Sequence, residues 1–132
     1  MPQALKMGVK QLVEDAKKEI EEVEASEAIA LLDDENVMIV DIRDVRELKR
    51  DGKIPGSFHC PRGMLEFWID PESQYFKPVF GEGKRILFHC AADLRSALAT
   101  QTAQRMGLTP VGHIKGGMKG WKEAGGPVEM PE

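Results

Sequence analysis

Cys90 is the residue in this sequence that is best placed to do chemistry. It ends an apolar run, RILFHC (85–90), and Arg95 follows it after four intervening residues. A cysteine at the end of a strand and before a helix can act as a nucleophile once its thiol loses the proton. The alternative is a buried and inert cysteine, since free cysteines are among the most buried residues in proteins.

The loop after Cys90 has the composition of an anion-binding nest. Ala91 and Ala92 are small enough for a tight turn, and a helix is expected from about Arg95 to Gly107. Several backbone N–H groups of such a loop point to its centre, and the helix dipole adds positive potential there. These surroundings favour a thiolate, and they would equally hold the charge of a persulfide sulfur. We therefore prefer the nucleophilic interpretation of Cys90.

The spacing between Cys90 and Arg95 separates two kinds of chemistry. In cysteine-dependent phosphatases of this general layout the spacing is one residue longer, and here Ser96 occupies the position where their arginine would lie. The shorter loop makes a smaller ring of donors, which suits a single sulfur atom better than a tetrahedral oxyanion. The spacing favours sulfur transfer over phosphate transfer.

Strand-like and helix-like segments alternate along the chain. The strongest strand candidates, VMIVDI (37–42) and RILFHC (85–90), are continuous apolar runs, as strands buried on both faces are. The alternation predicts a parallel sheet with helices on both faces. Ligands bind beyond the carboxyl ends of such strands, so Asp41 and Cys90 should lie near one edge. Further strands are expected at 22–24, 57–60 and 110–117.

Two helix starts are expected from capping residues. Ser26 precedes an apolar helical pattern and is expected to act as an N-cap. Asp44, with Glu47 three residues later, predicts a capping box.

Length and composition narrow the class of protein. The chain has 132 residues, 42% of them hydrophobic, which indicates one globular domain. Its net charge of -4 does not indicate the basic surface of a protein that binds nucleic acid. No apolar run is long enough to span a membrane. The first residues, MPQALKMGVK, lack the apolar segment of a secretory leader, so we expect a cytoplasmic protein with reduced thiols.

Neither the second cysteine nor the histidines predict a metal site. Cys60 has no nest or arginine after it, so a packing role is expected. The three histidines, His59, His89 and His113, have no helical metal-binding spacing.

Four stretches together resemble the rhodanese (sulfurtransferase) family in its small single-domain bacterial form. They are VDIR (40–43), KIPGSFHCPRG (53–63), HCAADLRSA (89–97) and VGHIKGGMKGW (111–121). The resemblance covers about residues 22–128, which leaves residues 1–21 as an N-terminal helical extension. It implies a rhodanese-like α/β fold: a parallel five-stranded sheet with helices on both faces, plus the extra N-terminal helix.

The resemblance also implies a function. Cys90 would take a sulfane sulfur from thiosulfate or from a persulfide donor, either a small compound or a protein, and pass it to a thiophilic acceptor such as cyanide. No metal or other cofactor, nucleic acid or membrane would take part. Asp41 and Arg43 are expected to form an ion pair beneath the loop. The residues expected to bind the substrate are Ala91, Ala92, Asp93, Leu94, Arg95 and Ser96.

Asp93 leaves several alternatives open. Its carboxylate could face Cys90 and repel thiosulfate, point outward, cap the following helix or pair with Arg95. A rhodanese-fold binding or regulatory module with little turnover is therefore a second hypothesis, and a phosphatase or arsenate reductase relative is a third. The oligomeric state, monomer or homodimer, stays open.

Overall fold

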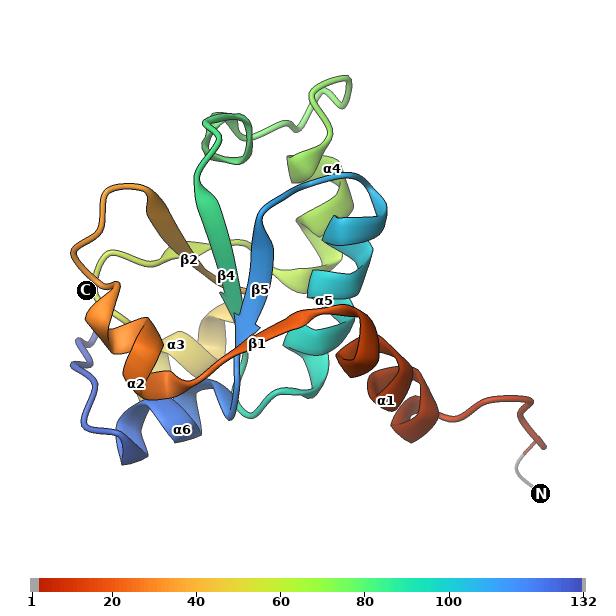
Figure 1. The fold of residues 1–132 in the computed structure, drawn as a ribbon, viewed down its shortest axis with the longest axis horizontal. Helices are drawn as coiled ribbons and strands as arrows, with labels where there is room; N and C mark the ends of the chain where they lie inside the picture. The colour runs from red at the N-terminus through yellow and green to blue at the C-terminus, as the bar shows by residue number, and fades with distance from the viewer. Residues whose placement is uncertain (1–2, 132) are drawn as a thin grey trace.

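The computed structural model describes residues 3–131 and contains one five-stranded sheet (Figure 1). The strand order is β1-β5-β4-β2-β3, and all neighbouring strands are parallel. Cys90 directly follows β4, the central strand, and this confirms the predicted parallel α/β architecture. The strands are Glu21–Val23 (β1), Val37–Asp41 (β2), Phe58–His59 (β3), Arg85–His89 (β4) and Val111–Ile114 (β5).

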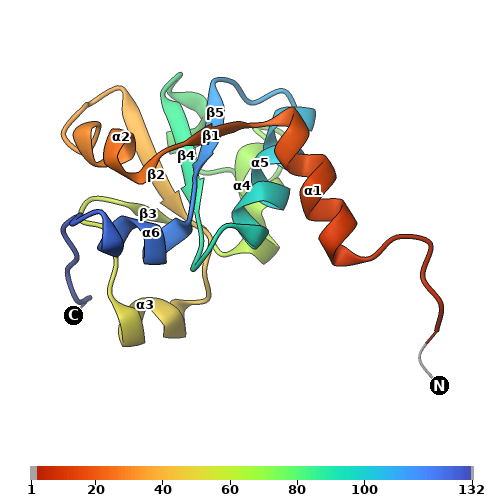
Figure 2. The same ribbon diagram turned by 60° about the horizontal axis from the view of Figure 1, so that its bottom comes forward.

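Helices cover both faces of the sheet (Figures 1 and 2). One face carries α1 (Val9–Glu19), α4 (Leu65–Ile69) and α5 (Leu94–Arg105). The other face carries α2 (Ala25–Ala30) and α6 (Gly117–Glu123), and α3 (Val45–Asp51) lies beyond the carboxyl ends of the strands. Two short 3-10 helices, η1 (Arg62–Met64) and η2 (Pro78–Gly81), lie in the long connection from β3 to β4.

The sheet has a hydrophobic core on each side because successive strand residues point to opposite faces. Val40 and Phe88 pack in the core beneath α4 and α5, whereas Ile39 and Leu87 pack beneath α2 and α6. Burying a side chain of this kind contributes about 1.5–3 kcal/mol relative to its exposure. The two cores hold β4, and with it the start of the Cys90 loop, in a fixed position.

The N-terminal helix docks on its own domain. Val13 and Ala16 of α1 are buried against Ala97 of α5. Val9 and Leu12, which share this face of α1 by their helical spacing, are exposed. The extension is therefore packed on α5, the helix that follows the Cys90 loop. The domain boundary at residues 21 and 22 stays a prediction.

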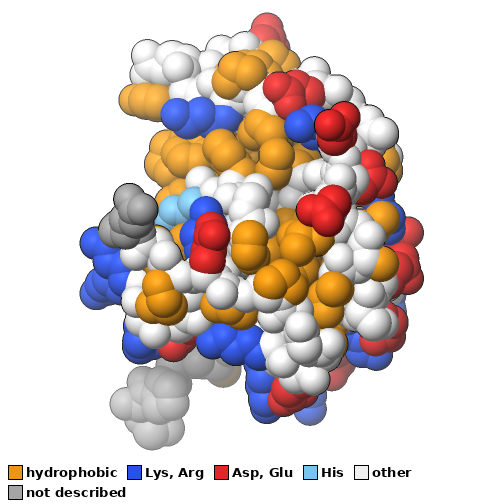
Figure 3. Space-filling model, turned by 90° about the vertical axis from the view of Figure 1, so that its left-hand side faces the viewer, with side chains coloured by type: hydrophobic (Ala, Val, Ile, Leu, Met, Phe, Trp, Pro, Cys, Tyr) orange, Lys and Arg blue, Asp and Glu red, His pale blue; other side chains and the backbone are white. Residues whose placement is uncertain are grey.

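The surface mixes charged and apolar side chains. On the side that Figure 3 shows, acidic and basic side chains are interspersed with hydrophobic ones. Within residues 3–131, no helix combines the length and the apolar character that a membrane crossing needs.

Candidate active site

Cys90 lies at the base of a short loop between β4 and α5. Its side chain is buried, and its Sγ accepts a hydrogen bond from the backbone N–H of Ser96 at 3.4 Å. Over residues 3–131, the structure gives no protein acceptor to the backbone N–H groups of residues 91–95. Five consecutive donors therefore follow the thiol, which is the composition of an anion nest.

The first turn of α6 holds this loop from the other side. The backbone N–H groups of Met118 and Lys119 donate to the carbonyl oxygens of Cys90 and Ala91, at 2.8 and 3.1 Å. Gly117 has φ +57°, and a Cβ there would lie 2.0 Å from the carbonyl oxygen of Ala92. Only glycine allows α6 to approach the loop this closely.

A hollow of about 420 Å³ opens beside the loop. Ala91 and Ala92 form part of its wall, and the exposed side chains of Lys119 and Lys122 come from α6. The other lining residues are Arg43, Asp51 and Met118. The two lysines make the lining of this hollow more basic than acidic, although the ammonium of Lys122 donates to the carbonyl oxygen of Asp51 at 2.8 Å.

Arg95 braces the loop against α3. Its guanidinium makes two hydrogen bonds to the carboxylate of Glu47, at 2.8 and 3.0 Å. Glu47 also accepts the backbone N–H of Asp44, which completes the predicted capping box of α3. The hydrogen bonds from Arg95 hold the pKa of Glu47 below its usual value, although partial burial acts in the opposite direction.

Asp93 pairs with the N-terminal helix. Its Oδ1 lies 3.1 Å from Nζ of Lys17, and its side chain makes no capping hydrogen bond to α5. Arg95 is bound to Glu47 and not to Asp93. Of the alternatives left open by the sequence, the structure therefore excludes helix capping and pairing with Arg95, and it shows an ion pair with Lys17 of α1 instead.

Asp41 and Arg43 form a buried ion pair at the end of β2. Their side chains are 0% and 1% exposed, with 2.8 Å between Nη2 of Arg43 and Oδ2 of Asp41. Arg43 also donates to the carbonyl oxygen of Gly52 at 2.8 Å. Burial raises the pKa of Asp41, but the hydrogen bonds from Arg43 and the nearby His89 outweigh it, so that the net pKa is lowered. That this pair supports the Cys90 loop stays a prediction.

Cys60 differs from Cys90 in its surroundings. It is fully buried in the core beneath α4 and α5. Burial raises the pKa of the Cys60 thiol to about 12, against a smaller lowering by Arg62. Cys60 therefore remains a protonated thiol and is a natural internal control for Cys90.

Two residues that the sequence analysis did not single out connect to Cys90 through Ser96. Oγ of Ser96 lies 3.5 Å from Sγ of Cys90 and 2.8 Å from Nδ1 of His113. Nε2 of His113 lies 2.9 Å from the carboxylate of Glu22 on β1. The contacts span 6, 17 and 91 positions of the chain, so no local sequence pattern signals them.

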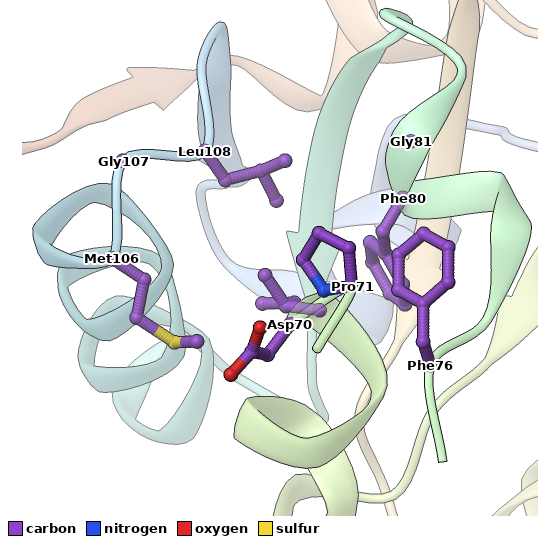
Figure 4. A pocket seen from close by; sticks show the side chains of 9 residues that line it. Asp70, Pro71, Phe76, Phe80, Gly81, Met106, Gly107 and Leu108 are labelled. Atoms are coloured by element: carbon purple, nitrogen blue, oxygen red, sulfur yellow. The ribbon is translucent and has the colours of Figure 1, made fainter. Parts of the chain in front are cut away.

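A second hollow lies at the opposite end of the sheet (Figure 4). It has a volume of about 410 Å³ and is walled mainly by apolar side chains, with the carboxylate of Asp70 among them. Its residues adjoin the starts of β4 and β5, whereas Cys90 follows the end of β4. They are Ile69, Asp70, Pro71, Phe76, Phe80, Gly81, Met106, Gly107 and Leu108.

The sequence of residues 24–124 matches the family model described as the rhodanese-like domain. The chain belongs to the rhodanese-like domain family. A mouse relative, thiosulfate sulfurtransferase/rhodanese-like domain-containing protein 3, is 31% identical over 97 residues. That match covers 70% of this chain and 62% of the mouse protein, so the chain spans less than two thirds of this relative's length.

Solved structures of this rhodanese-like fold include two informative relatives. One, from Rhodopseudomonas palustris, is described as a protein of unknown function and possible tyrosine phosphatase; it is 57% identical, with a TM-score of 0.94, over 98% of this chain and 99% of that one. Another is the polysulfide-sulfur transferase homodimer of Wolinella succinogenes, 28% identical with a TM-score of 0.69, over 91% of this chain and 85% of that one.

Proposed function

We propose that this rhodanese-like protein is a sulfurtransferase that carries sulfane sulfur as a persulfide on Cys90. The observation that carries the proposal is the Cys90 loop, in which the five backbone N–H groups of residues 91–95 have no acceptor within residues 3–131. Such a ring of donors stabilises a negative charge at its centre. A terminal persulfide sulfur carries its charge one bond beyond Sγ, and we expect the N–H groups of residues 91–95 to donate to it.

The first half-reaction is a thiolate attack on the donor. The Cys90 thiolate forms a bond to the outer sulfur of thiosulfate, the S–S bond of thiosulfate breaks, and sulfite leaves with the bonding electron pair. One negative charge moves from Sγ to the terminal sulfur, so no external oxidant or reductant is needed. In the second half-reaction, an acceptor such as cyanide takes the terminal sulfur and the Cys90 thiolate returns.

The hollow beside the loop favours a small anionic donor. Lys119 and Lys122 line it, and the pairing of Asp93 with Lys17 removes the repulsion that a free carboxylate would exert on thiosulfate. Thiosulfate and polysulfide are donors of this class.

A phosphatase is the second candidate, because the relative from Rhodopseudomonas palustris is described as a possible tyrosine phosphatase. Two features of this chain count against it. The spacing between Cys90 and Arg95 gives a smaller ring than a phosphate needs. The guanidinium of Arg95 is also engaged by Glu47 instead of facing the nest unpaired.

The test is the production of thiocyanate from thiosulfate or polysulfide and cyanide. We expect turnover by the unaltered protein, none above background by Cys90→Ser, and near-normal turnover by Cys60→Ser, because the Cys60 thiol stays protonated. The same three proteins are assayed with p-nitrophenyl phosphate, on which we expect no Cys90-dependent hydrolysis.

Two outcomes would overturn the proposal. Cys90-dependent hydrolysis of p-nitrophenyl phosphate without thiocyanate formation would assign the protein to phosphate chemistry. Absence of both activities, with every sulfane donor tried, would favour a binding or regulatory module. Folding of each variant is checked by circular dichroism, so that a lost activity is not mistaken for a lost fold.

A further inference from the structure

We propose that Ser96, His113 and Glu22 form a proton relay that takes the proton of Cys90 to the protein surface. The inference rests on the proposed function, because a persulfide carrier must deprotonate the Cys90 thiol before it can attack a sulfur donor. It assigns new roles to three residues, and two of them, His113 and Glu22, lie far from the Cys90 loop in the sequence.

The hydrogen bonds of the chain all point in one direction. The carboxylate of Glu22 can only accept, so Nε2 of His113 carries the proton that it shares with Glu22 over 2.9 Å. In a neutral imidazole, Nδ1 is then an acceptor, and Oγ of Ser96 donates to it over 2.8 Å. Oγ of Ser96 is left to accept from the thiol of Cys90 at 3.5 Å.

Burial explains why such a route is needed. Cys90 and His113 are 1% and 0% exposed, and Ser96 is 0% exposed, whereas the side chain of Glu22 is 30% exposed. The buried thiol has little direct contact with water, and the relay connects it to a group that has. The relay ends at Glu22 on β1, and β5 separates β1 from β4 in the sheet. This end therefore lies away from the Cys90 loop, which would receive the donor.

The charges around His113 keep its ring ready to accept a proton. Burial lowers the pKa of His113, while Glu22 on β1 and Asp93 in the loop act to raise it and Lys17 on α1 to lower it. The resting imidazole is therefore neutral near pH 7. Glu22, in direct contact, stabilises the imidazolium that forms when the proton arrives.

The proton transfer balances at each atom. The S–H bond of Cys90 breaks as an O–H bond forms on Ser96, whose original proton moves to Nδ1 of His113. His113 then carries a proton on both ring nitrogens as an imidazolium, which Glu22 stabilises and through which the Nε2 proton exchanges with water. The hydroxyl of Ser96 now carries the former thiol proton and donates to the Cys90 thiolate.

The test measures Cys90 alkylation by iodoacetamide as a function of pH, in a Cys60→Ser background. We expect Glu22→Gln, Ser96→Ala and His113→Asn each to move the pH of half-maximal alkylation upward by about one unit, which makes alkylation at pH 7 about tenfold slower. Glu24→Gln serves as the matched control, because Glu24 follows β1 directly and is exposed, and its carboxylate lies near Lys115 and not His113. Its profile should coincide with that of the unaltered protein.

A spectroscopic measurement separates a relay from a packing role. The 15N chemical shifts of His113 should report a neutral ring protonated at Nε2, and Glu22→Gln should weaken that preference. Glu22 is partly exposed, so this variant is expected to fold even if His113→Asn does not. Coincident alkylation profiles for the unaltered protein and Glu22→Gln would overturn the relay.

Failure of the relay and failure of the proposed function give different results. Alkylation of Cys90 needs no sulfur donor, so a shifted profile supports the relay even if no thiocyanate forms. Thiocyanate formation with unshifted profiles supports the sulfurtransferase and overturns the relay.

Discussion

At the scale of single residues, the site is built from partners that lie far apart in the sequence. Arg95 is held by Glu47 and Asp93 by Lys17, so each charged residue of the loop is paired with a different helix. The loop can therefore contain a carboxylate next to a nucleophile without directing that charge at the sulfur.

The pairing of Asp93 leads to a prediction about reactivity. Asp93→Asn should change the rate of Cys90 alkylation by less than about twofold at any pH, because the carboxylate is already neutralised by Lys17 and is partly solvated. Lys17→Met should slow alkylation more than Asp93→Asn does, since it frees the carboxylate near the thiol. The double variant should recover the rate of Asp93→Asn. A large acceleration by Asp93→Asn alone would mean that the carboxylate faces Cys90.

Sequence reasoning identified the residues of the loop but not their partners. Cys90 and Arg95 are recognisable because their spacing is local, and the fold places Cys90 where it was expected, at the end of a buried strand. Lys17 and His113 could not be identified, because their contacts to the loop depend on how α1 and β5 pack. The histidine looked like an ordinary strand residue.

At the scale of elements, the contact between α6 and the Cys90 loop sets the shape of the nest. Gly117→Ala should sharply reduce Cys90 alkylation and thiocyanate formation, because a Cβ would lie 2.0 Å from the carbonyl oxygen of Ala92 and force the loop to move. Gly125→Ala is the matched control: φ is +83° there, but nothing lies within 4 Å of the added Cβ.

Both glycine variants should lose about 1–2 kcal/mol of stability from the left-handed backbone conformation, measured by urea unfolding. Only Gly117→Ala should also lose reactivity at Cys90. Equal activity of the two variants would show that the loop does not depend on its contact with α6.

Element boundaries were predicted well where a local motif defines them. The capping box of Asp44 and Glu47 is confirmed at the start of α3. The expected cap at Ser26 is wrong, because α2 begins at Ala25 and Glu24 occupies the N-cap position. A single serine predicts the start of a helix less well than the two residues of a capping box do, because a short helix can begin at either of two neighbouring residues.

At the scale of the whole molecule, the alternation of strands and helices was enough to predict the parallel sheet. The two apolar runs became β2 and β4, which are adjacent and buried on both faces. Strand order and the docking of α1 on α5 could not be derived from periodicity, because both depend on contacts between distant segments. The family resemblance supplied the five-stranded architecture.

The persulfide sulfur that we propose on Cys90 can be detected by the mass of the whole protein. The protein is incubated with thiosulfate or polysulfide, desalted and measured by intact mass spectrometry, with Cys90→Ser and Cys60→Ser alongside. We expect a gain of one sulfur atom in the unaltered protein and in Cys60→Ser, its loss on treatment with cyanide, and no gain in Cys90→Ser. No adduct with any sulfane donor, or an adduct that persists in Cys90→Ser, would contradict a persulfide on Cys90.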